Sequence, residues 1–353
     1  MKKVSPVVRP RVFVGLSGGV DSAVSAALLK EQGFEVTGVF IKVWSPDFLP
    51  CTWREERRDA MRVAVELNIP FLFFDFEEEY KKAVADKMIS EYALGRTPNP
   101  DILCNREIKF GAFWKKAKEL GADYIATGHY AQNKDNRLFE GKDDEKDQSY
   151  FLWTLTEEDL KHCLFPVGHL EKSEVRKLAE RFNIPVAEKK DSQGICFLGD
   201  VDIETFLPHF LNIKSGDILN TNEEVIGRHK GAIYYTLGER HGFEITKNTP
   251  DSKAFYVVSK DMQANTITVS NIQNEIESMS PTKIKIKETN LKIQHSVLNL
   301  SARIRYRGDK IKISLNGDTV EFESPQRGLS TGQSIVFYAD DECLGGAVVD
   351  ELY

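Results

Sequence analysis

The chain has 353 residues, of which 41% are hydrophobic and 29% are charged, and its formal net charge is −7. This composition is ordinary for a soluble globular protein of two or three domains, and the net charge argues against indiscriminate binding of nucleic acid. No run of about eighteen apolar residues predicts a membrane span, and the first residues lack the apolar core of a secretory signal. We therefore expect a cytoplasmic protein.

Strands and helices alternate in the first 130 residues. Apolar runs predict strands over residues 11–16, 34–44, 70–76 and 122–130, and the segment 21–33 predicts a helix. Continuous apolar strands separated by helices indicate a parallel sheet covered on both faces, so we expect an α/β domain. Ligands of such sheets bind at the carboxyl ends of the strands.

The pattern changes in the middle of the chain. Residues 134–148 are highly charged and predict a hairpin or a surface loop, and helices are expected around residues 157–163 and 173–182. After residue 211, short β-rich runs such as "AIYYTL" are separated by turn residues, which predicts two small antiparallel β domains with a seam near residues 273–281. The expected domains are residues 1–208, a central β domain over 209–275, and a β-barrel over 276–353.

A glycine-rich stretch, "GLSGGVDS", follows the first predicted strand and opens a helix at residues 15–22. Gly18 and Gly19 would let backbone N–H groups approach a phosphate, and Ser17 and Ser22 add hydroxyl donors. The stretch lacks the lysine of a P-loop. Asp21 is a candidate for a carboxylate linked to magnesium. The alternative is an ordinary glycine turn in which Asp21 caps the helix.

A later stretch, "ATGHYA", ends the strand expected over residues 122–130. Gly128 would permit the close approach of a nucleotide, and His129 would face a polyanion. The alternative for His129 is a structural histidine whose hydrogen bonds are satisfied within the protein.

Cysteines are few: Cys51, Cys104, Cys163, Cys196 and Cys343. Their odd number and the lack of a CxxC pair predict neither a disulfide framework nor a zinc site, and most isolated cysteines are small core residues. Cys104 differs because it lies in "GRTPNPDILCN", residues 95–105. Two prolines make this stretch a poor helix, so we expect a stiff loop that holds Asp101 and Cys104. The alternative is a turn in which both residues are incidental.

The C-terminal part has a basic segment. Between residues 281 and 312 there are nine Lys or Arg and two acidic residues. Strand alternation would place Lys283, Lys285 and Lys287 on one face, and it would do the same for the arginines of "RIRYR", residues 303–307. Such a stripe suits RNA phosphates, and the alternative is the solvated face of a barrel.

The stretch at residues 15–22 resembles the pyrophosphate-binding loop of the ATP pyrophosphatase superfamily. Those enzymes cleave ATP between the α and β phosphates, adenylate an oxygen, and let a nucleophile displace AMP. Nearly the whole chain resembles the tRNA-specific 2-thiouridylases, the MnmA family, through "TPNPDxxCN", "DSQGICF", "KDQSYFL", "LFPVG", "YYTLGERHG" and "LGGAVV".

The resemblance implies ATP-dependent sulfur transfer to C2 of the wobble uridine in tRNAs for lysine, glutamate and glutamine, with Mg²⁺ bridging the phosphates. It implies that Cys196 carries a persulfide received from a sulfur-donor protein. Cys104 would then attack that persulfide and leave a Cys104–Cys196 disulfide, and direct attack of the persulfide on the activated base is the other option. Asp101 would act as general acid or base, and sulfur transfer needs a thiolate because a neutral thiol is a much weaker nucleophile.

The resemblance also implies ligand contacts. Those to ATP would come from Gly15, Leu16, Ser17, Gly18, Gly19, Val20, Asp21, Ser22, Ile41 and Gly128. Those to the target base would come from Asn99, Pro100 and Asp101. Those to tRNA would come from His129, Lys146, Asp147, Gln148, Arg305, Tyr306 and Gln333. The chain departs from the family at Gly308, Glu239 and His241, which bears on tRNA docking, and Ile41 stands where methionine is usual.

Two other functions stay open. One is an ATP pyrophosphatase that forms a C–N bond on a small molecule and needs no cysteine. The other is a non-catalytic tRNA-binding protein with a vestigial nucleotide loop, although the intact stretch at residues 15–22 argues against it.

Overall fold

The computed structural model describes residues 9–49, 52–190, 196, 202–246, 253–292 and 300–353, so Cys51 lies outside the described residues. The chain forms two compact units. The first takes its described residues from 1–84, 101–199 and 341–343, and the second from 85–100, 200–340 and 344–353. No helix in these described ranges is long and apolar enough to cross a membrane.

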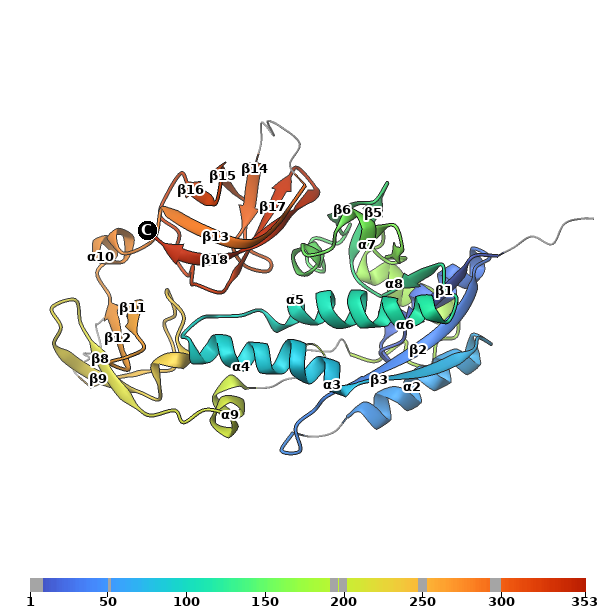
Figure 1. The fold of residues 1–353 in the computed structure, drawn as a ribbon, viewed down its shortest axis with the longest axis horizontal. Helices are drawn as coiled ribbons and strands as arrows, with labels where there is room; N and C mark the ends of the chain where they lie inside the picture. The colour runs from blue at the N-terminus through green and yellow to red at the C-terminus, as the bar shows by residue number, and fades with distance from the viewer. Residues whose placement is uncertain (1–8, 50–51, 191–195, 197–201, 247–252, 293–299) are drawn as a thin grey trace, which may run out of the picture. The chain divides into compact units, whose positions relative to one another are not determined.

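A parallel sheet of five described strands forms the core of the first unit (Figure 1). The strands are β1 (Arg11–Gly15), β2 (Glu35–Val43), β3 (Phe71–Phe76), β4 (Tyr124–Ala126) and β7 (Cys163–Leu164). Their order is β3-β2-β1-β4-β7, and the pairs run parallel. The expected α/β fold of the N-terminal part is confirmed.

Two strands of this sheet differ from the expectation. The strand expected over residues 122–130 ends at Ala126, and the strand β7 begins at Cys163, where we expected a helix to continue. Helix α7 (Glu157–Leu160) has a single turn, closed by a capping box between Thr156 and Asp159. A strand of two residues has no periodicity of its own, so only its pairing with β4 identifies it.

Helices cover the sheet of the first unit. They include α1 (Val20–Glu31), α2 (Trp53–Glu66), α8 (Lys172–Arg181) and the single turn α3 (Glu77–Tyr80) with the π-helical η1 (Lys81–Ala85). The interior of α1 consists of small and branched residues, and most of the helix is buried. Val12 and Val14 of β1, Val24 of α1 and Val175 of α8 share one apolar core. Burial of this core is the main stabilising contribution that fixes the start of α1 at the end of β1.

A long helical run begins at the second proline, which corrects the expected loop. It consists of α5 (Pro100–Cys104), the π-helical η2 (Asn105–Ala112) and α6 (Phe113–Glu119), the green helix in Figure 1. Pro100 is its first residue. Proline is tolerated there because the N–H that it lacks has no intrahelical partner and its φ is already helical. Cys104 is therefore held by a helix.

The charged segment begins with a hairpin, as predicted. Strands β5 (Ala131–Lys134) and β6 (Arg137–Glu140) are antiparallel. The two turn residues, Asp135 and Asn136, have φ of 53° and 61°, the pattern of a type I′ turn. The 3₁₀ turn η3 (Ser149–Leu152) comes later in the same segment.

The second unit contains a helix, two short turns and the central β domain. The helix is α4 (Asp86–Ala93), and the turns are α9 (Ile203–Phe206) and η4 (Leu207–His209). The central sheet has the order β10-β9-β8-β12-β11. Its strands are β8 (Gly216–Leu219), β9 (Val225–His229), β10 (Glu244–Ile245), β11 (Tyr256–Asp261) and β12 (Thr266–Ser270). The pair β8–β12 is parallel and the other pairs are antiparallel.

The run "AIYYTL" contains the 3₁₀ turn η5 (Ala232–Tyr234), so the strand expected there is wrong.

The last domain is a closed six-strand barrel. After α10 (Gln273–Ser278) come β13 (Lys283–Leu291), β14 (Leu300–Arg303), β15 (Ile311–Asn316), β16 (Thr319–Phe322), β17 (Ser334–Ala339) and β18 (Glu342–Leu352). Their order is β13-β16-β15-β14-β17-β18, and pairing of β13 with β18 closes the barrel. Alternate residues such as Ile284, Ile286 and Phe337 fill the interior. The expected barrel is confirmed.

Candidate active site

The glycine-rich stretch forms a tight turn between β1 and α1. Gly18 has φ of +75°, and a Cβ atom there would lie 2.6 Å from the backbone oxygen of Glu56. The Ser22 hydroxyl accepts a hydrogen bond from the Ser17 N–H at 3.2 Å and donates one to the Gly19 oxygen at 3.1 Å. The turn therefore brings backbone N–H groups to the N-terminus of a 12-residue helix, an arrangement that binds phosphate.

Other expected nucleotide contacts lie at the same edge of the sheet. Gly15 ends β1, and Leu16 and Val20 are buried, so these two offer a ligand backbone groups rather than side chains. Gly128, just after β4, packs against the start of α1, since a Cβ there would lie 2.7 Å from the Ser22 nitrogen. Ile41 is buried near the carboxyl end of β2. Strand ends thus bring these positions to the edge where sheets of this kind bind ligands.

Asp21 is held by two residues that the sequence did not single out. Lys172 at the start of α8 contacts both carboxylate oxygens at 2.7 and 2.9 Å, and the Tyr130 hydroxyl donates to one of them at 2.8 Å. Lys172 lies outside every motif found in the sequence, so nothing in the sequence pointed to it. A single carboxylate beside a phosphate loop fits Mg²⁺, which usually binds one or two carboxylates together with substrate phosphates.

The two cysteines expected to react lie together in the first unit. The Sγ atom of Cys104 donates to that of Cys196 at 3.3 Å. Asp101 Oδ1 accepts the Cys196 backbone N–H at 2.8 Å, and the Tyr80 hydroxyl donates to the Cys196 carbonyl at 2.9 Å. Residues 92 positions apart in the chain therefore form one cluster of two thiols and a carboxyl. Cys163, in contrast, is buried in β7.

The two thiols have opposite electrostatic environments. Burial, and then the hydrogen bond to Cys196, raise the pKa of Cys104 well above its usual value. The hydrogen bond from Cys104, and next the charge of Lys109, lower the pKa of Cys196. Burial raises the pKa of Asp101. The cluster therefore makes Cys196 the more acidic of the two thiols and makes the Asp101 carboxyl a weaker acid than an exposed one.

His129 lies inside the protein rather than facing a polyanion. It is 6% exposed, its Nδ1 lies 2.7 Å from Thr127 Oγ1, and its Nε2 lies 3.4 Å from Lys109 Nζ. Burial, and next the charge of Lys109, lower the pKa of His129 well below its usual value. A neutral, buried imidazole is poorly suited to hold phosphate, so the structure favours a structural role for His129.

The "KDQ" segment is built into its own loop. The Asp147 carboxylate is buried and accepts hydrogen bonds from the Gly141 N–H at 2.9 Å and from the Ser149 N–H and hydroxyl at 3.0 Å. Gln148 and Tyr130 exchange hydrogen bonds through the Gln148 side chain and backbone. Of the three expected tRNA contacts, Asp147 and Gln148 thus hold the loop. Lys146 is half-buried.

The lysine stripe of β13 is on one face, as predicted, but acidic residues accompany it. Lys283 lies 3.0 Å from Glu321, Lys285 lies 3.6 Å from Glu351, and Lys287 lies 2.7 Å from Asp350. These half-exposed pairs neutralise much of the positive field that the sequence suggested. The lysines therefore resemble a solvated barrel face.

The expected arginine stripe is wrong, because β14 ends at Arg303. Residues 305–308 form a turn in which the Gly308 N–H donates to the Arg305 oxygen at 3.1 Å, and Arg307 has φ of 59°. Arg305 is exposed and forms no ion pair with a described residue. The Arg307 guanidinium lies 5.1 Å from the centre of the Tyr306 ring. Exposed cations next to an aromatic ring suit an RNA contact.

The remaining expected contacts have clear environments. The Gln333 side chain accepts the Ser330 N–H at 2.9 Å, which gives it a role within the barrel. Asn99 is half-buried and directly precedes α5, and Pro100, also half-buried, begins that helix. Glu239 accepts the Thr236 N–H at 2.9 Å, and His241 contacts its neighbour Arg240.

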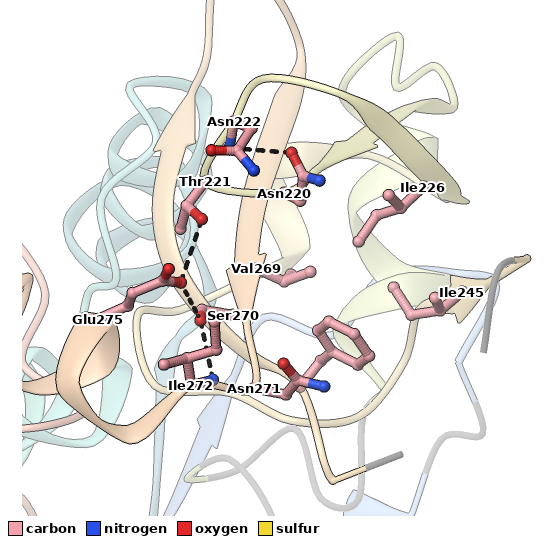
Figure 2. A pocket seen from close by; sticks show the side chains of 11 residues that line it. Asn220, Thr221, Asn222, Ile226, Ile245, Val269, Ser270, Asn271, Ile272 and Glu275 are labelled. Atoms are coloured by element: carbon pink, nitrogen blue, oxygen red, sulfur yellow. Dashed lines mark hydrogen bonds between the residues drawn. The ribbon is translucent and has the colours of Figure 1, made fainter. Parts of the chain in front are cut away.

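A cavity of about 250 Å³ lies in the central β domain (Figure 2). Ile226, Ile245 and Val269 form its apolar side. On the other side, Glu275 accepts hydrogen bonds from Ser270 at 2.6 Å and Thr221 at 3.1 Å. Glu275 is the one charged side chain among the described residues that line it. A negative charge at its wall makes this cavity unsuited to a phosphate.

Family models match three consecutive parts of the chain. Residues 10–200 match a model described as the tRNA methyl transferase HUP domain, residues 204–271 match its PRC-barrel domain, and residues 279–349 match an aminomethyltransferase beta-barrel domain.

Relatives match the chain over almost its full length. It is 43% identical to the tRNA-specific 2-thiouridylase MnmA of Streptococcus sanguinis, over 97% of this chain and 96% of that protein, and 43% identical to the Streptococcus mutans protein of the same name, over 98% and 96%. Among solved structures, the U34-tRNA thiolase NcsA from Methanococcus maripaludis is 22% identical with a TM-score of 0.35, covering 50% of this chain and 58% of that one. On the identity and coverage of its relatives, the chain belongs to the tRNA-specific 2-thiouridylase family, MnmA.

Proposed function

We propose that this chain is an ATP-dependent tRNA-uridine 2-sulfurtransferase, which replaces the C2 oxygen of the wobble uridine with sulfur. Its family membership supports the reaction class. The observation that carries the proposal is the thiol pair, since Cys104 and Cys196 lie 3.3 Å apart beside the Asp101 carboxyl. A ligase or a simple RNA-binding protein has no use for such a cluster.

The first half-reaction activates the oxygen. Attack of the C2 oxygen on the α-phosphate of ATP forms an adenylate and breaks the bond between the α and β phosphates, so pyrophosphate leaves. The backbone of Gly18 and Gly19 and the N-terminus of α1 would hold that pyrophosphate. Asp21 would hold Mg²⁺, which when bound neutralises phosphate charge. Lys172, already beside Asp21, would add a positive charge at the same phosphates.

The second half-reaction delivers the sulfur. The Cys196 thiolate attacks the outer sulfur of a donor persulfide, an S–S bond forms on Cys196, and the donor leaves as a thiolate. One route is attack of Cys104 on the Cys196 sulfur, which frees hydrosulfide to displace AMP from the base. The other is direct attack of the Cys196 persulfide on the base, followed by cleavage by Cys104. Both routes end with a Cys104–Cys196 disulfide, which a thiol reductant then opens.

Asp101 supplies the proton control in this scheme. Burial raises its pKa, which favours a carboxyl that gives a proton to the departing group or takes one from Cys104. Its hydrogen bond to the Cys196 N–H fixes the carboxyl at the thiol pair. Asn99 and Pro100, next to Asp101 in the chain, would contact the target base.

The finer proposals concern the partners. The substrates would be tRNAs for lysine, glutamate and glutamine, and the sulfur would come from a persulfide-carrying donor protein. Arg305 on the turn after β14 is an exposed candidate for a tRNA contact, and Tyr306 beside it is half-buried. Two other expected tRNA contacts, Asp147 and Gln148, form hydrogen bonds with their own loop and with Tyr130. Gln333 accepts a hydrogen bond from Ser330 within the barrel.

The test is nucleoside mass analysis of unmodified glutamate tRNA after incubation with the protein, Mg-ATP and a persulfide donor. We expect one sulfur to replace one oxygen on the wobble uridine, with AMP released. Cys104→Ser and Cys196→Ser should each abolish thiolation, whereas Cys163→Ala, a buried cysteine in β7, should retain it.

Two results would contradict the proposal. AMP release without a thiolated nucleoside, unchanged in both serine variants, would indicate a ligase acting on a small molecule. Binding of tRNA without any ATP turnover would indicate a non-catalytic binding protein.

A further inference from the structure

Lys109 places a cation at the thiol pair, and the two half-reactions give it no role. Its Nζ lies 3.4 Å from His129 Nε2, and its side chain also hydrogen-bonds the Cys196 sulfur. Removing an ammonium from water costs several kcal/mol unless an anion compensates it. His129 cannot supply that anion, because an imidazole is either neutral or positively charged.

The π-helical backbone of η2 is what brings Lys109 to the cysteines. Lys109 comes five residues after Cys104. In an α-helix five residues rotate a side chain by about 140°, which would point Lys109 away from Cys104. In a π-helix the backbone bonds run from residue i to i+5, so residues five apart lie on the same face. Such segments are uncommon and cluster at functional sites, in keeping with this placement.

The titratable groups around Cys196 and Lys109 come from four elements. Cys104 and Asp101 come from α5, Tyr80 from α3, Lys109 from η2, and His129 from the segment after β4. Tyr80 stays protonated because burial raises its pKa, and His129 stays neutral. Among these described groups Lys109 is the one cation, so it can compensate one negative charge.

Cys196 and Asp101 are the two candidates for that charge, and Cys196 is favoured because burial raises the pKa of Asp101 while the hydrogen bond from Cys104 lowers the pKa of Cys196. Cys104 donates its hydrogen bond to Cys196, which leaves Cys104 as the thiol and Cys196 as the acceptor. Burial works against the charged form of Lys109, but the sulfurs of Cys196 and Cys104 outweigh it and raise the pKa of Lys109 above its usual value. Cation and thiolate therefore stabilise each other.

We propose that Lys109 is a catalytic residue of the sulfur-transfer centre, which holds Cys196 as the thiolate that accepts sulfur and then stabilises the terminal anion of the Cys196 persulfide. The first part rests on the Cys104–Cys196 hydrogen bond and on the contact of Lys109 with the Cys196 sulfur. The second part rests on the proposed function. In both states the ammonium contacts the reacting sulfur.

The test is the rate of Cys196 alkylation by iodoacetamide between pH 5.5 and 10, followed on the Cys196 peptide by mass spectrometry in the full chain without tRNA or ATP. In Lys109→Met we expect the midpoint to rise by about one pH unit, so that alkylation at pH 7 is about tenfold slower. Lys109→Arg should keep the low midpoint because it keeps the charge. Lys116→Met, which removes an exposed lysine of α6, is the matched control and should behave as wild type.

Single-turnover thiolation of tRNA by persulfide-loaded protein tests the second part. We expect Lys109→Met to lower its rate at least about tenfold without changing the affinity for tRNA. If Lys109→Met does not fold, Lys109→Gln decides by the same two measurements.

Three outcomes would overturn the inference: a wild-type Cys196 midpoint at or above the ordinary thiol value of about 8.5, an unchanged midpoint in Lys109→Met, or a midpoint raised equally in Lys109→Arg. A failure of the proposed function looks different. In that case the wild type thiolates no tRNA, while the alkylation profiles still separate as expected, and the part of the proposal that concerns the thiolate stands.

Discussion

Adding a methyl group at Gly18 should disturb the conformation of the phosphate loop. Its φ of +75° disfavours any side chain, and a Cβ atom would press on the Glu56 backbone oxygen at 2.6 Å. Backbone cannot move aside as a flexible side chain can. The turn therefore depends on glycine for its conformation and also for its space.

We predict that Gly18→Ala loses ATP binding. Gly33→Ala is the matched control, since Gly33 also has positive φ, at +92°, but nothing lies within 4 Å of its Cβ position. Both variants should lose about 1 kcal/mol of stability from the strained φ, and Gly18→Ala should lose more because its Cβ meets the Glu56 backbone. Only Gly18→Ala should lose nucleotide affinity as well, measured by calorimetric titration with a non-hydrolysable ATP analogue. Equal affinities in the two variants would contradict the role of the loop.

Asp101 should link stability to pH. Because burial raises its pKa in the folded chain, the folded state binds this proton more tightly than the unfolded state does. The carboxyl therefore lowers the free energy of unfolding as pH rises from about 3.9, the unfolded value, through the folded pKa. Asp101→Asn should then melt higher than wild type at pH 7.5, with the gain shrinking towards pH 4, and it should not thiolate tRNA.

Thermal melts of both proteins at several pH values measure this effect. Asp144→Asn, at an exposed position of the loop before η3, should show no such pH-dependent gain. A variant at position 101 that is less stable than wild type at every pH would show that the carboxylate stabilises the fold.

At the scale of elements, strand β13 and the turn after β14 should contribute differently to RNA binding. Lys287 of β13 is paired with Asp350, whereas Arg305 on the turn forms no ion pair with a described residue. A phosphate contact releases counterions, and losing it lowers the slope of log affinity against log salt by about 0.7 to 0.9.

We predict that Arg305→Gln lowers the magnitude of this slope for tRNA by about 0.7 to 0.9, the amount expected for one phosphate contact. Lys287→Gln should leave the slope nearly unchanged. Filter binding or fluorescence anisotropy across a salt series measures both. A larger loss of slope in Lys287→Gln would mean that tRNA separates Lys287 from Asp350 and that the strand, not the turn, meets the phosphates.

These two elements also differ in how well local sequence predicts them. Alternation in "KIKIK" correctly placed the lysines on one face, because Ile284 and Ile286 fill the barrel between them. The same reasoning failed for "RIRYR", because the hydrogen bond between Gly308 and Arg305 turns the chain. The end of a short strand also depends on pairing partners far along the chain, such as Val336 opposite Arg303, which local alternation does not contain.

For the whole molecule, the fold class and the barrel could be predicted from apolar periodicity and from the strings shared with the family. The phosphate turn and the two reactive cysteines were also recognisable from short sequence motifs. Lys172, Lys109 and Tyr80 were not, since tertiary packing brings Lys172 and Tyr80 to the site and a π-helical backbone, which the sequence did not reveal, brings Lys109 there. The loop expected around Pro100 was wrong for a related reason, because proline can either end a helix or begin one, and the residues after it decide between the two.

The π-helical turn affects how the site would tolerate an in-frame deletion. A π segment is an α-helix with extra residues in its turns, so removing one residue between Cys104 and Lys109 would let that turn close as an ordinary α-helical turn. Substitutions in that stretch exchange single side chains. The in-frame loss of one codon would instead leave a shorter, more regular helix in which the lysine, then four residues after the cysteine, stays on the same face.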